Sequence, residues 1–382
     1  MITRIKSKNI ILDSGLFDGF LYIDGDVILD VTKNDLPYDR EIDVGGLFVS
    51  PGFIDIHTHG GGGYSFTDGT DALIGAVEFH MRHGTTSILP TVSAAPLAEM
   101  ALVCEYIKEA RERRPDLTPI IGAHLEGPYL SMAQNGAQSA SFITPPCEDE
   151  YKPILEKYRD IIKRVTYAPE EDLGERFASY LSSLGILASA GHTNAKYADM
   201  KRANACGTSL VTHLFSCTST ITREGGFRFP GVIETTLLED SFIAEIIADG
   251  KHLPSELIRL VVKCKGTDRV ILVTDSLPQT GSLAAEGVMG EIEYIIEDGV
   301  CKLRDRSAFA GSIATADRLV RVMTKDAGVP LSDAVKMITK NPADLLGLNT
   351  GSLQRGKYAD IAIFDSDINV KRVFARGNEI KL

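Results

Sequence analysis

Residues 51–60 of this chain read PGFIDIHTHG, an apolar run that ends in two histidines one residue apart, His57 and His59. Alternate residues of a β-strand point to the same face, so both imidazoles can point to one place at the strand's carboxyl end. Imidazole is the commonest side-chain ligand of metal ions. The stretch predicts a strand that ends at a metal site, although two nearby histidines alone also fit ordinary polar residues.

After this stretch the sequence alternates short apolar runs with helical patterns. Apolar residues recur at helical spacing in segments such as 70–83, 97–113, 174–183 and 254–263. Eight strand–helix repeats over roughly 250 residues predict an α/β fold, a (β/α)₈ TIM-type barrel with its function at the carboxyl ends of the strands. The eight predicted strands are residues 52–57, 85–92, 119–126, 162–168, 185–191, 208–214, 242–248 and 269–275.

An open doubly wound sheet is the alternative fold, and it would place a Gly-x-Gly-x-x-Gly turn after the first strand. The glycine run at 60–63 does not have that spacing, and it lacks the Lys-Ser/Thr pair of a phosphate-binding loop. We therefore predict a flexible loop there.

Both ends of the chain differ from the middle. Short β-like runs separated by turn residues occupy 10–12, 20–23, 27–31 and 47–49, and similar runs occupy 357–365 and 370–377. These runs predict a small β-sandwich domain built from residues 1–50 plus 351–382. Residues 51–350 would then form the metal-dependent barrel domain.

Composition excludes several classes of protein. The chain has 382 residues, of which 44% are hydrophobic and 24% charged, and its net charge of −12 argues against a nucleic-acid or anionic-membrane surface. No apolar run reaches the roughly 18 residues that span a bilayer, and the N-terminus does not resemble a signal peptide. Six cysteines without a Cys-x-x-Cys pair indicate reduced thiols. We expect a cytoplasmic protein with a small-molecule partner, and any anionic ligand needs a local counter-charge.

Histidines and carboxylates stand at the carboxyl ends of five predicted strands. Beyond the first strand, these residues are Glu126, His192, His213 and Asp275. Because strand ends meet at one rim of a barrel, we expect them to converge on a metal site. Nitrogen and oxygen ligands suit zinc first, and also iron, cobalt, manganese or nickel. The helical histidines His80 and His83 are predicted to be surface or packing residues.

The chemistry of such a site is hydrolytic. A metal ion lowers the pKa of bound water from about 15.7 to about 7 and polarises a carbonyl group. Asp275 beside that water can accept its proton and return it to a leaving nitrogen. The site therefore predicts hydrolysis of an amide-type bond.

Six motifs, together with the segment GSLQRGKYADI at 351–361, resemble the amidohydrolase superfamily. They are most similar to the N-acetylglucosamine-6-phosphate deacetylase family. The resemblance implies that Glu126, His192 and His213 hold the principal metal, with Glu126 where other branches use a carboxylated lysine. His57 and His59 would complete a second position, so one or two ions are implied. The motifs are PGFIDIHTH (51–59), HLEGP (124–128), AGHT (190–193), THLF (212–215), ADGKH (248–252) and VTDS (273–276).

The resemblance also implies substrate contacts. Asp275 matches the general acid and base, His252 matches a histidine that contacts the sugar, and Asp249 would orient its loop. Ser312 lies in a segment that matches a loop of the sugar pocket. Two departures alter contacts: Gln138 stands where the family has histidine, and Ser216 begins SCTST where the family has Asn-Ala-Met. The implied phosphate-binding arginine is Arg223, with Arg228 as a second candidate.

The implied reaction is metal-dependent removal of the N-acetyl group of N-acetylglucosamine 6-phosphate, which gives glucosamine 6-phosphate and acetate. The implied assembly is a homodimer in which a partner can reach the phosphate end of the pocket. Two alternatives share the same ligands: another N-acetylhexosamine phosphate, such as N-acetylgalactosamine 6-phosphate, or a different N-acyl substrate. A non-catalytic scaffold would have lost ligands or the final aspartate, and neither is lost.

Overall fold

The computed structural model describes residues 1–117 and 119–381; residue 382, the last position of the predicted small domain, lies outside this part. Eight parallel strands pair in chain order. The first and last meet at the rim, where Asp275 N–H donates to His57 O and His59 N–H donates to Ser276 O, both at 2.9 Å. This arrangement confirms the predicted barrel. The strands are β6 Phe53–Thr58, β9 Thr85–Val92, β10 Ala123–Glu126, β11 Ile162–Tyr167, β12 Leu187–Ala190, β13 Leu210–Val211, β16 Ile243–Ile246 and β17 Val270–Leu272.

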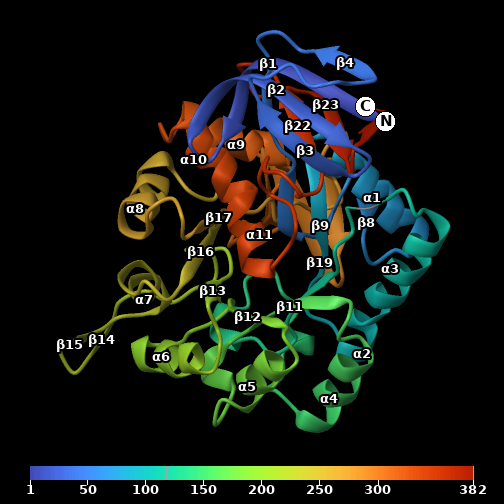
Figure 1. Ribbon diagram of the computed structural model, residues 1–382. Helices are drawn as coiled ribbons and strands as arrows, with labels where there is room; N and C mark the ends of the chain where they lie inside the picture. The colour runs from blue at the N-terminus through green and yellow to red at the C-terminus, as the bar shows by residue number, and fades with distance from the viewer. Residues whose placement is uncertain (118, 382) are drawn as a thin grey trace.

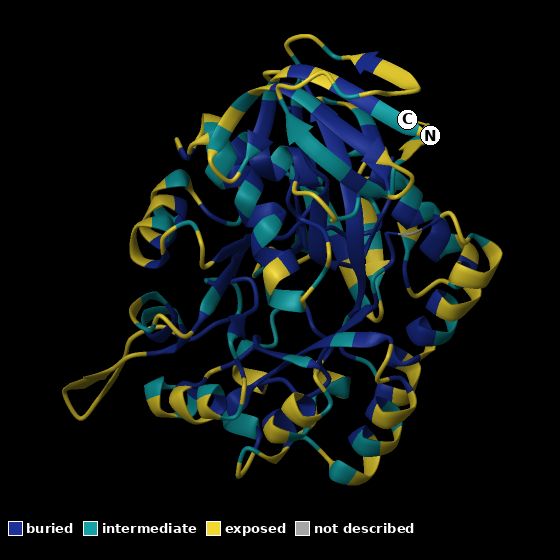
Figure 2. Ribbon diagram, viewed as in Figure 1, coloured by how far each residue is buried: buried dark blue, intermediate teal, exposed yellow. Residues whose placement is uncertain are grey.

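Helices surround the barrel, and Figure 2 shows the strands buried and the outer faces of the helices exposed. Helix α9 illustrates why they form: Leu319, Val320 and Met323 share a buried face, whereas Lys325 is exposed. The helices are α1 Thr70–Arg82, α2 Leu97–Met100, α3 Leu102–Arg113, α4 Glu148–Lys157, α5 Arg176–Ser183, α6 Tyr197–Ala205, α7 Val232–Leu238, α8 Ser255–Lys265, α9 Ala316–Lys325, α10 Leu331–Ile338 and α11 Lys340–Leu346.

The two ends of the chain form one sheet at the top of Figure 1, where the blue N-terminal and red C-terminal strands lie together. Strand β22 pairs antiparallel with β5, and a buried apolar cluster lies against the sheet, as the predicted sandwich requires. The boundaries at residues 50 and 351 stay a prediction. The strands are β1 Ile2–Leu12, β2 Gly15–Asp24, β3 Val27–Thr32, β4 Arg40–Asp43, β5 Phe48–Pro51, β22 Ile361–Phe364, β23 Val370–Ala375 and β24 Asn378–Ile380.

Three small antiparallel sheets were not predicted. Strands β14 Thr222–Glu224 and β15 Phe227–Phe229 form a hairpin that projects from the lower left of Figure 1. Strands β18 Glu286–Met289, β19 Ile292–Glu297, β20 Val300–Leu303 and β21 Phe309–Gly311 form a four-stranded sheet between β17 and α9. The glycine run forms a short hairpin of β7 Gly60–Gly61 and β8 Tyr64–Ser65 instead of a flexible loop. Gly62 and Gly63 make its turn possible, because their φ values of 66° and 90° suit glycine.

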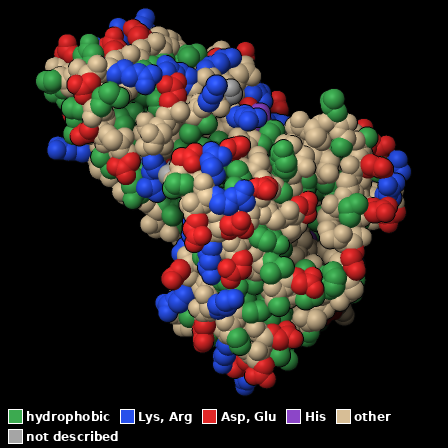
Figure 3. Space-filling view, turned by 90° about the vertical axis from the view of Figure 1, so that its right-hand side faces the viewer, with side chains coloured by type: hydrophobic (Ala, Val, Ile, Leu, Met, Phe, Trp, Pro, Cys, Tyr) green, Lys and Arg blue, Asp and Glu red, His purple; other side chains and the backbone are tan. Residues whose placement is uncertain are grey.

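The surface carries mixed charge. Figure 3 shows acidic and basic side chains interspersed on one face, without a broad basic patch. Across residues 1–117 and 119–381, no helix has the length and hydropathy needed to cross a membrane. All six cysteines are free in the described chain, as the sequence predicts.

Candidate metal centre

His57, at the end of β6, is oriented by a buried ion pair inside the barrel. Its Nδ1 lies 2.9 Å from Glu245 Oε1, and because a carboxylate can only accept, Nδ1 donates. Glu245 also pairs with Arg164, and both side chains are fully buried. Burial raises the pKa of Glu245, but the charge of Arg164 and the hydrogen bond from His57 lower it to about 2. His57 Nε2 is buried without a hydrogen bond and faces Glu126 and Asp275.

The other three histidines of the site are oriented in the same way. Each presents Nε2 to the centre and directs Nδ1 to an oxygen atom, an arrangement typical of metal-binding histidines. Ser93 has one hydroxyl hydrogen, which it donates to Met289 Sδ, so it accepts the hydrogen bond from His59. The oxygen partners are Ser93 Oγ for His59 at 3.2 Å, Gln134 O for His192 at 3.1 Å and Ser216 O for His213 at 3.1 Å.

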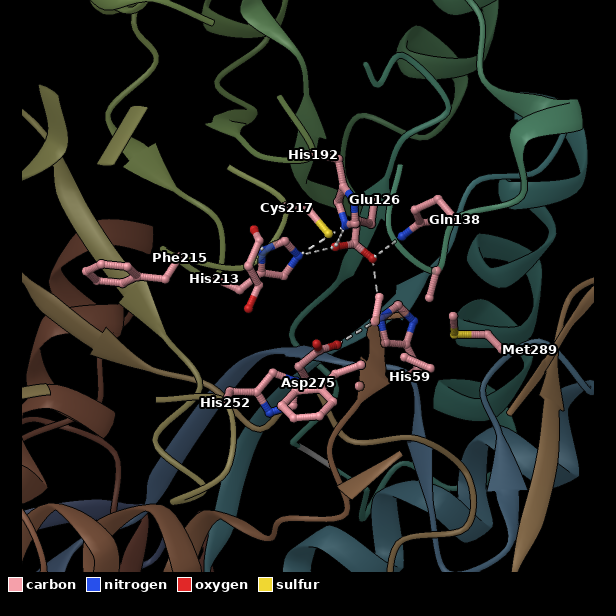
Figure 4. Close-up of a pocket in the computed structure, with 16 residues that line it drawn as sticks. His59, Glu126, Gln138, His192, His213, Phe215, Cys217, His252, Asp275 and Met289 are labelled. Carbon is pink, nitrogen blue, oxygen red and sulfur yellow. Dashed lines mark hydrogen bonds and ion pairs between the residues drawn. The ribbon is translucent and has the colours of Figure 1, made fainter. Parts of the chain in front are cut away.

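Glu126, at the end of β10, lies at the centre of these nitrogens (Figure 4). Gln138 Nε2 donates to its Oε2 at 2.8 Å, while Ala94 N–H donates to Gln138 Oε1 at 2.7 Å and fixes the amide orientation. Gln138 therefore positions the Glu126 carboxylate. Oε1 of Glu126 lies 3.0 Å from His213 Nε2, 3.3 Å from His192 Nε2 and 3.3 Å from His57 Nε2, and Oε2 lies 3.3 Å from His59 Nε2.

Asp275 follows β17 and closes the other side of the site. Its Oδ1 lies 3.2 Å from His59 Nε2 and 3.5 Å from His57 Nε2. Burial raises the pKa of Asp275, but the charge of His57 and the hydrogen bond with His59 outweigh burial, so its pKa lies below the ordinary value. Asp275 is therefore a carboxylate at neutral pH and can accept a proton.

The backbone at this rim is held in the left-handed region. Five of the ten described non-glycine residues with positive φ belong to the site or its lining, which is unusual because a side chain rarely adopts this conformation. Such residues concentrate where the surrounding structure holds them for function. The five are His192 at 46°, His213 at 28°, Phe215 at 81°, Cys217 at 49° and Asp275 at 46°.

The donor set fits a divalent metal ion. His192 Nε2 and His213 Nε2 lie 3.2 Å apart, so two lone pairs face each other where a cation would separate them. Burial lowers the pKa of His57, yet the carboxylates of Glu126 and Asp275 raise it to about 10, which shows how strongly the site favours positive charge. Two overlapping groups have ligand atoms within 4.8 Å of one another: His57, His59 and Asp275, and His57, Glu126 and His213.

A cavity of about 250 Å³ opens onto these ligands. His252, Ser216 and Gln138, which were predicted to contact the substrate, line it, and His252 Nδ1 donates to Asp249 Oδ2 at 2.9 Å. Ser312 does not line it. Its buried hydroxyl donates to Thr274 O, so it supports the Asp275 turn from behind.

The two predicted phosphate-binding arginines do not line the cavity either. Arg223 and Arg228 face each other across the exposed β14–β15 hairpin. A projecting hairpin keeps both guanidinium groups away from the metal ligands of the same chain. The roles of all the predicted site residues therefore stay predictions.

Several residues of the site were not found from the sequence. Glu245 and Arg164 could have been identified, because each is a charged residue within an apolar strand pattern, and a buried charge needs a partner. The cavity-lining residues Cys217, in a loop, and Met289, at the end of β18, have no such signal in their own segments.

The match to known proteins agrees with this geometry. The model of the family described as "Amidohydrolase family" matches residues 48–380.

The chain belongs to the amidohydrolase family.

Several relatives of this amidohydrolase are deacetylases. It is 32% identical to N-acetylglucosamine-6-phosphate deacetylase of Bacillus subtilis, over 90% of this chain and 87% of the relative. It is 30% identical to N-acetylgalactosamine-6-phosphate deacetylase of Shewanella sp., over 85% of this chain and 81% of the relative. Among solved structures, a mutant of N-acetyl-D-glucosamine-6-phosphate deacetylase from Mycobacterium smegmatis, in complex with N-acetyl-D-glucosamine-6-phosphate, matches with a TM-score of 0.91 and 29% identity, covering 100% of both chains. These matches confirm the expected enzyme class, a hydrolase that acts on an N-acetyl amide.

Proposed function

We propose that this amidohydrolase hydrolyses the N-acetyl group of N-acetylglucosamine 6-phosphate to give glucosamine 6-phosphate and acetate. The observation that carries the proposal is Glu126 surrounded by four inward-facing Nε2 atoms, with the Asp275 carboxylate 3.2 Å from one of them. This is a site for activating water next to an amide. Relatives with that activity, 32% identical over most of the chain, support the choice of substrate.

Different residues of the site have different roles in the proposed reaction. His57, His59, Glu126, His192 and His213 would hold the metal, which supplies Lewis acidity that lowers the pKa of water and polarises the amide carbonyl. Asp275 accepts the proton of the attacking water and delivers it to the nitrogen as the C–N bond breaks. His252, fixed by Asp249, faces the cavity and contacts the sugar.

The identity and number of the ions follow from the same donors. We expect zinc, with iron, cobalt, manganese or nickel as alternatives, because nitrogen and carboxylate ligands suit all of them. One ion would use Glu126, His192 and His213, and a second would use His57 and His59. Elemental analysis of purified protein measures both properties directly.

The phosphate group requires cations, and no lysine or arginine among residues 1–117 and 119–381 lines the cavity. The β14–β15 hairpin carries Arg223 and Arg228 and also exposes apolar side chains: Phe227 is 74% exposed and Phe229 36%, and Ile221, just before the hairpin, is 56% exposed. Exposed apolar residues on a projecting hairpin suit a protein interface. We therefore propose a homodimer in which the hairpin of one subunit brings an arginine to the phosphate end of the partner's cavity. The cytoplasmic location stays a prediction.

One assay tests the function. Acetate release is measured with N-acetylglucosamine 6-phosphate, N-acetylgalactosamine 6-phosphate and free N-acetylglucosamine, each with and without a chelator. We expect the first substrate to have the highest kcat/KM and all turnover to require metal. A preference for the galactosamine substrate would favour the activity of the Shewanella relative, and equal kcat/KM for free and phosphorylated sugar would refute a phosphosugar substrate.

Mixed dimers test the assembly. One subunit carries Asp275→Asn with an intact hairpin, and the other carries Arg223→Ala and Arg228→Ala with an intact Asp275. If the hairpin serves the partner, the mixed dimer regains a low KM at one of its two sites. If the hairpin serves its own subunit, the mixture keeps the high KM of the arginine variant.

A further inference from the structure

A second cavity of about 720 Å³, here called the side chamber, adjoins the metal pocket. The two cavities share His59, Ala137, Gln138 and Met289. Small-molecule sites have volumes of about 300–1,000 Å³, so the metal pocket falls just below this range and the side chamber lies well within it. A ligand of the metal centre therefore has room to extend into the side chamber.

The lining of the side chamber is apolar and acidic. Helices α2 and α3 contribute Met100, Val103 and Tyr106, and Phe142 and Val288 face them. Its charged residues other than His59 are Asp68, Glu99 and Glu291, and no lysine or arginine lines it among the residues that the structure describes. Like charges repel, so this chamber disfavours a phosphate group and accepts an uncharged, partly apolar one.

The position of the chamber assigns it to one end of the substrate. Figure 4 places Gln138, Met289 and His59 on one side of the metal site, with Phe215 and His252 on the opposite side. The sugar and its phosphate belong on the side of His252, the residue that we propose contacts the sugar. An amide at the metal then directs its acyl group toward the side chamber.

A flexible side chain, Met289, lies between the two cavities. Met289 Sδ accepts a hydrogen bond from Ser93 Oγ at 3.2 Å, and Met289 lines both cavities. Methionine is unbranched and adapts its shape to different neighbours. It can therefore move aside for an acyl chain without disturbing the barrel.

We infer that this enzyme hydrolyses N-acyl groups longer than acetyl, with the acyl chain in the side chamber; this inference rests on the proposed phosphosugar substrate. Water adds its oxygen to the acyl carbon, the C–N bond breaks, and the nitrogen receives a proton. The products are the amine of glucosamine 6-phosphate and a short-chain fatty acid. No oxidant or cofactor other than the metal is required.

The test uses glucosamine 6-phosphate acylated with acetyl, propionyl, butyryl or hexanoyl groups, and it measures glucosamine 6-phosphate release by the metal-loaded enzyme. Each methylene that has no room in an apolar pocket costs about 10- to 200-fold in kcat/KM. We expect the butyryl substrate to stay within about tenfold of the acetyl substrate, because the chamber accommodates the added methylenes.

A pair of variants locates the acyl chain. Val288 lines the side chamber from β18 and is 59% exposed, so Val288→Trp can narrow the chamber without disturbing a core. We expect it to lower kcat/KM for the butyryl and hexanoyl substrates at least tenfold and to leave acetyl hydrolysis within threefold. Leu283→Trp is the matched control, because Leu283 is fully exposed and does not line the chamber.

Three outcomes overturn the inference in distinguishable ways. Rapid acetyl hydrolysis with a hundredfold loss for propionyl and butyryl would refute the acyl chamber and leave the proposed function intact. If no acylated glucosamine 6-phosphate reacts, the proposed function fails and the inference fails with it. If Val288→Trp slows acetyl, butyryl and hexanoyl hydrolysis to the same extent, the acyl chain does not occupy the chamber.

Discussion

The barrel rim and the β14–β15 hairpin differ in how fully one chain positions their side chains. At the rim, His57, Glu126 and Asp275 are more than nine-tenths buried, and other residues of the same chain fix their orientation. On the hairpin, Arg223 and Arg228 are exposed and belong to a two-stranded projection. The difference supports our proposal that the barrel carries the chemistry, whereas the exposed hairpin recognises the phosphate. The predictions below test this division, starting with the largest expected effect.

The first prediction removes the central ligand of the rim. Glu126→Ala deletes the carboxylate that lies between four imidazoles, so tightly bound metal and turnover should be lost together. Elemental analysis and acetate release measure the two losses. Glu156→Ala on α4 is the control for a lost surface carboxylate and should change neither. A fully active Glu126→Ala protein with a full complement of metal would place the active site elsewhere.

The second prediction separates catalysis from metal binding. Asp275→Asn keeps the shape of the side chain but cannot accept a proton, so kcat should fall by about 10²- to 10⁴-fold. The metal content should change little, because Glu126, His192 and His213 remain. Steady-state kinetics and elemental analysis of one preparation test both statements. Activity within threefold of the parent would remove Asp275 from the role of acid and base.

The outcome of these two predictions depends on residues that the sequence already identified. His57, Glu126, His192, His213 and Asp275 were predictable because parallel strand ends must meet at one rim, whatever the loops do. The eight strands were predictable for a different reason, because continuous apolar runs mark strands that are buried on both faces.

The remaining parts of the site depend on contacts that leave no local pattern. Ser312 has a side chain that could contact a sugar, but tertiary packing directs it to Thr274 O. Met289 lines the cavity because the β18–β21 sheet folds back over the rim, and nothing in its own segment indicates this. The resemblance implied Arg223 or Arg228 for phosphate binding, which stays a prediction, but no local pattern indicated that both lie on a hairpin that projects from their own barrel.

The third prediction concerns Glu245, which orients His57 and pairs with Arg164. Glu245→Gln keeps an acceptor for His57 but removes the charge that pairs with the buried Arg164. Leaving one buried charge unpaired costs about 3–5 kcal/mol of folding free energy. Loss of a residue that orients a metal-binding histidine also lowers metal affinity, by about 10- to 100-fold. Chemical denaturation and metal titration measure the two effects, and unchanged values in both would show that the ion pair does not support the site.

The fourth prediction concerns the hairpin and has the smallest expected effect. Arg223→Ala and Arg228→Ala are made separately, and the one that contacts phosphate should raise KM for N-acetylglucosamine 6-phosphate about tenfold, equal to about 1.4 kcal/mol. Metal content and kcat should not change, because the hairpin does not contact the ligands. Arg355→Ala removes an exposed arginine of the small domain and serves as the control.

The dependence of KM on salt concentration provides a second test of this prediction. Exposed charges are screened over about 8–10 Å at physiological ionic strength, so the arginine effect should shrink as salt is added, whereas the Asp275→Asn effect should persist. A guanidinium group also binds phosphate through two parallel hydrogen bonds, so Arg→Lys should restore only part of the lost affinity. If neither arginine variant changes KM, the phosphate is recognised by residues of the cavity such as His252 and Ser216. The barrel would then hold the whole substrate, and the proposed division between rim and hairpin would fail.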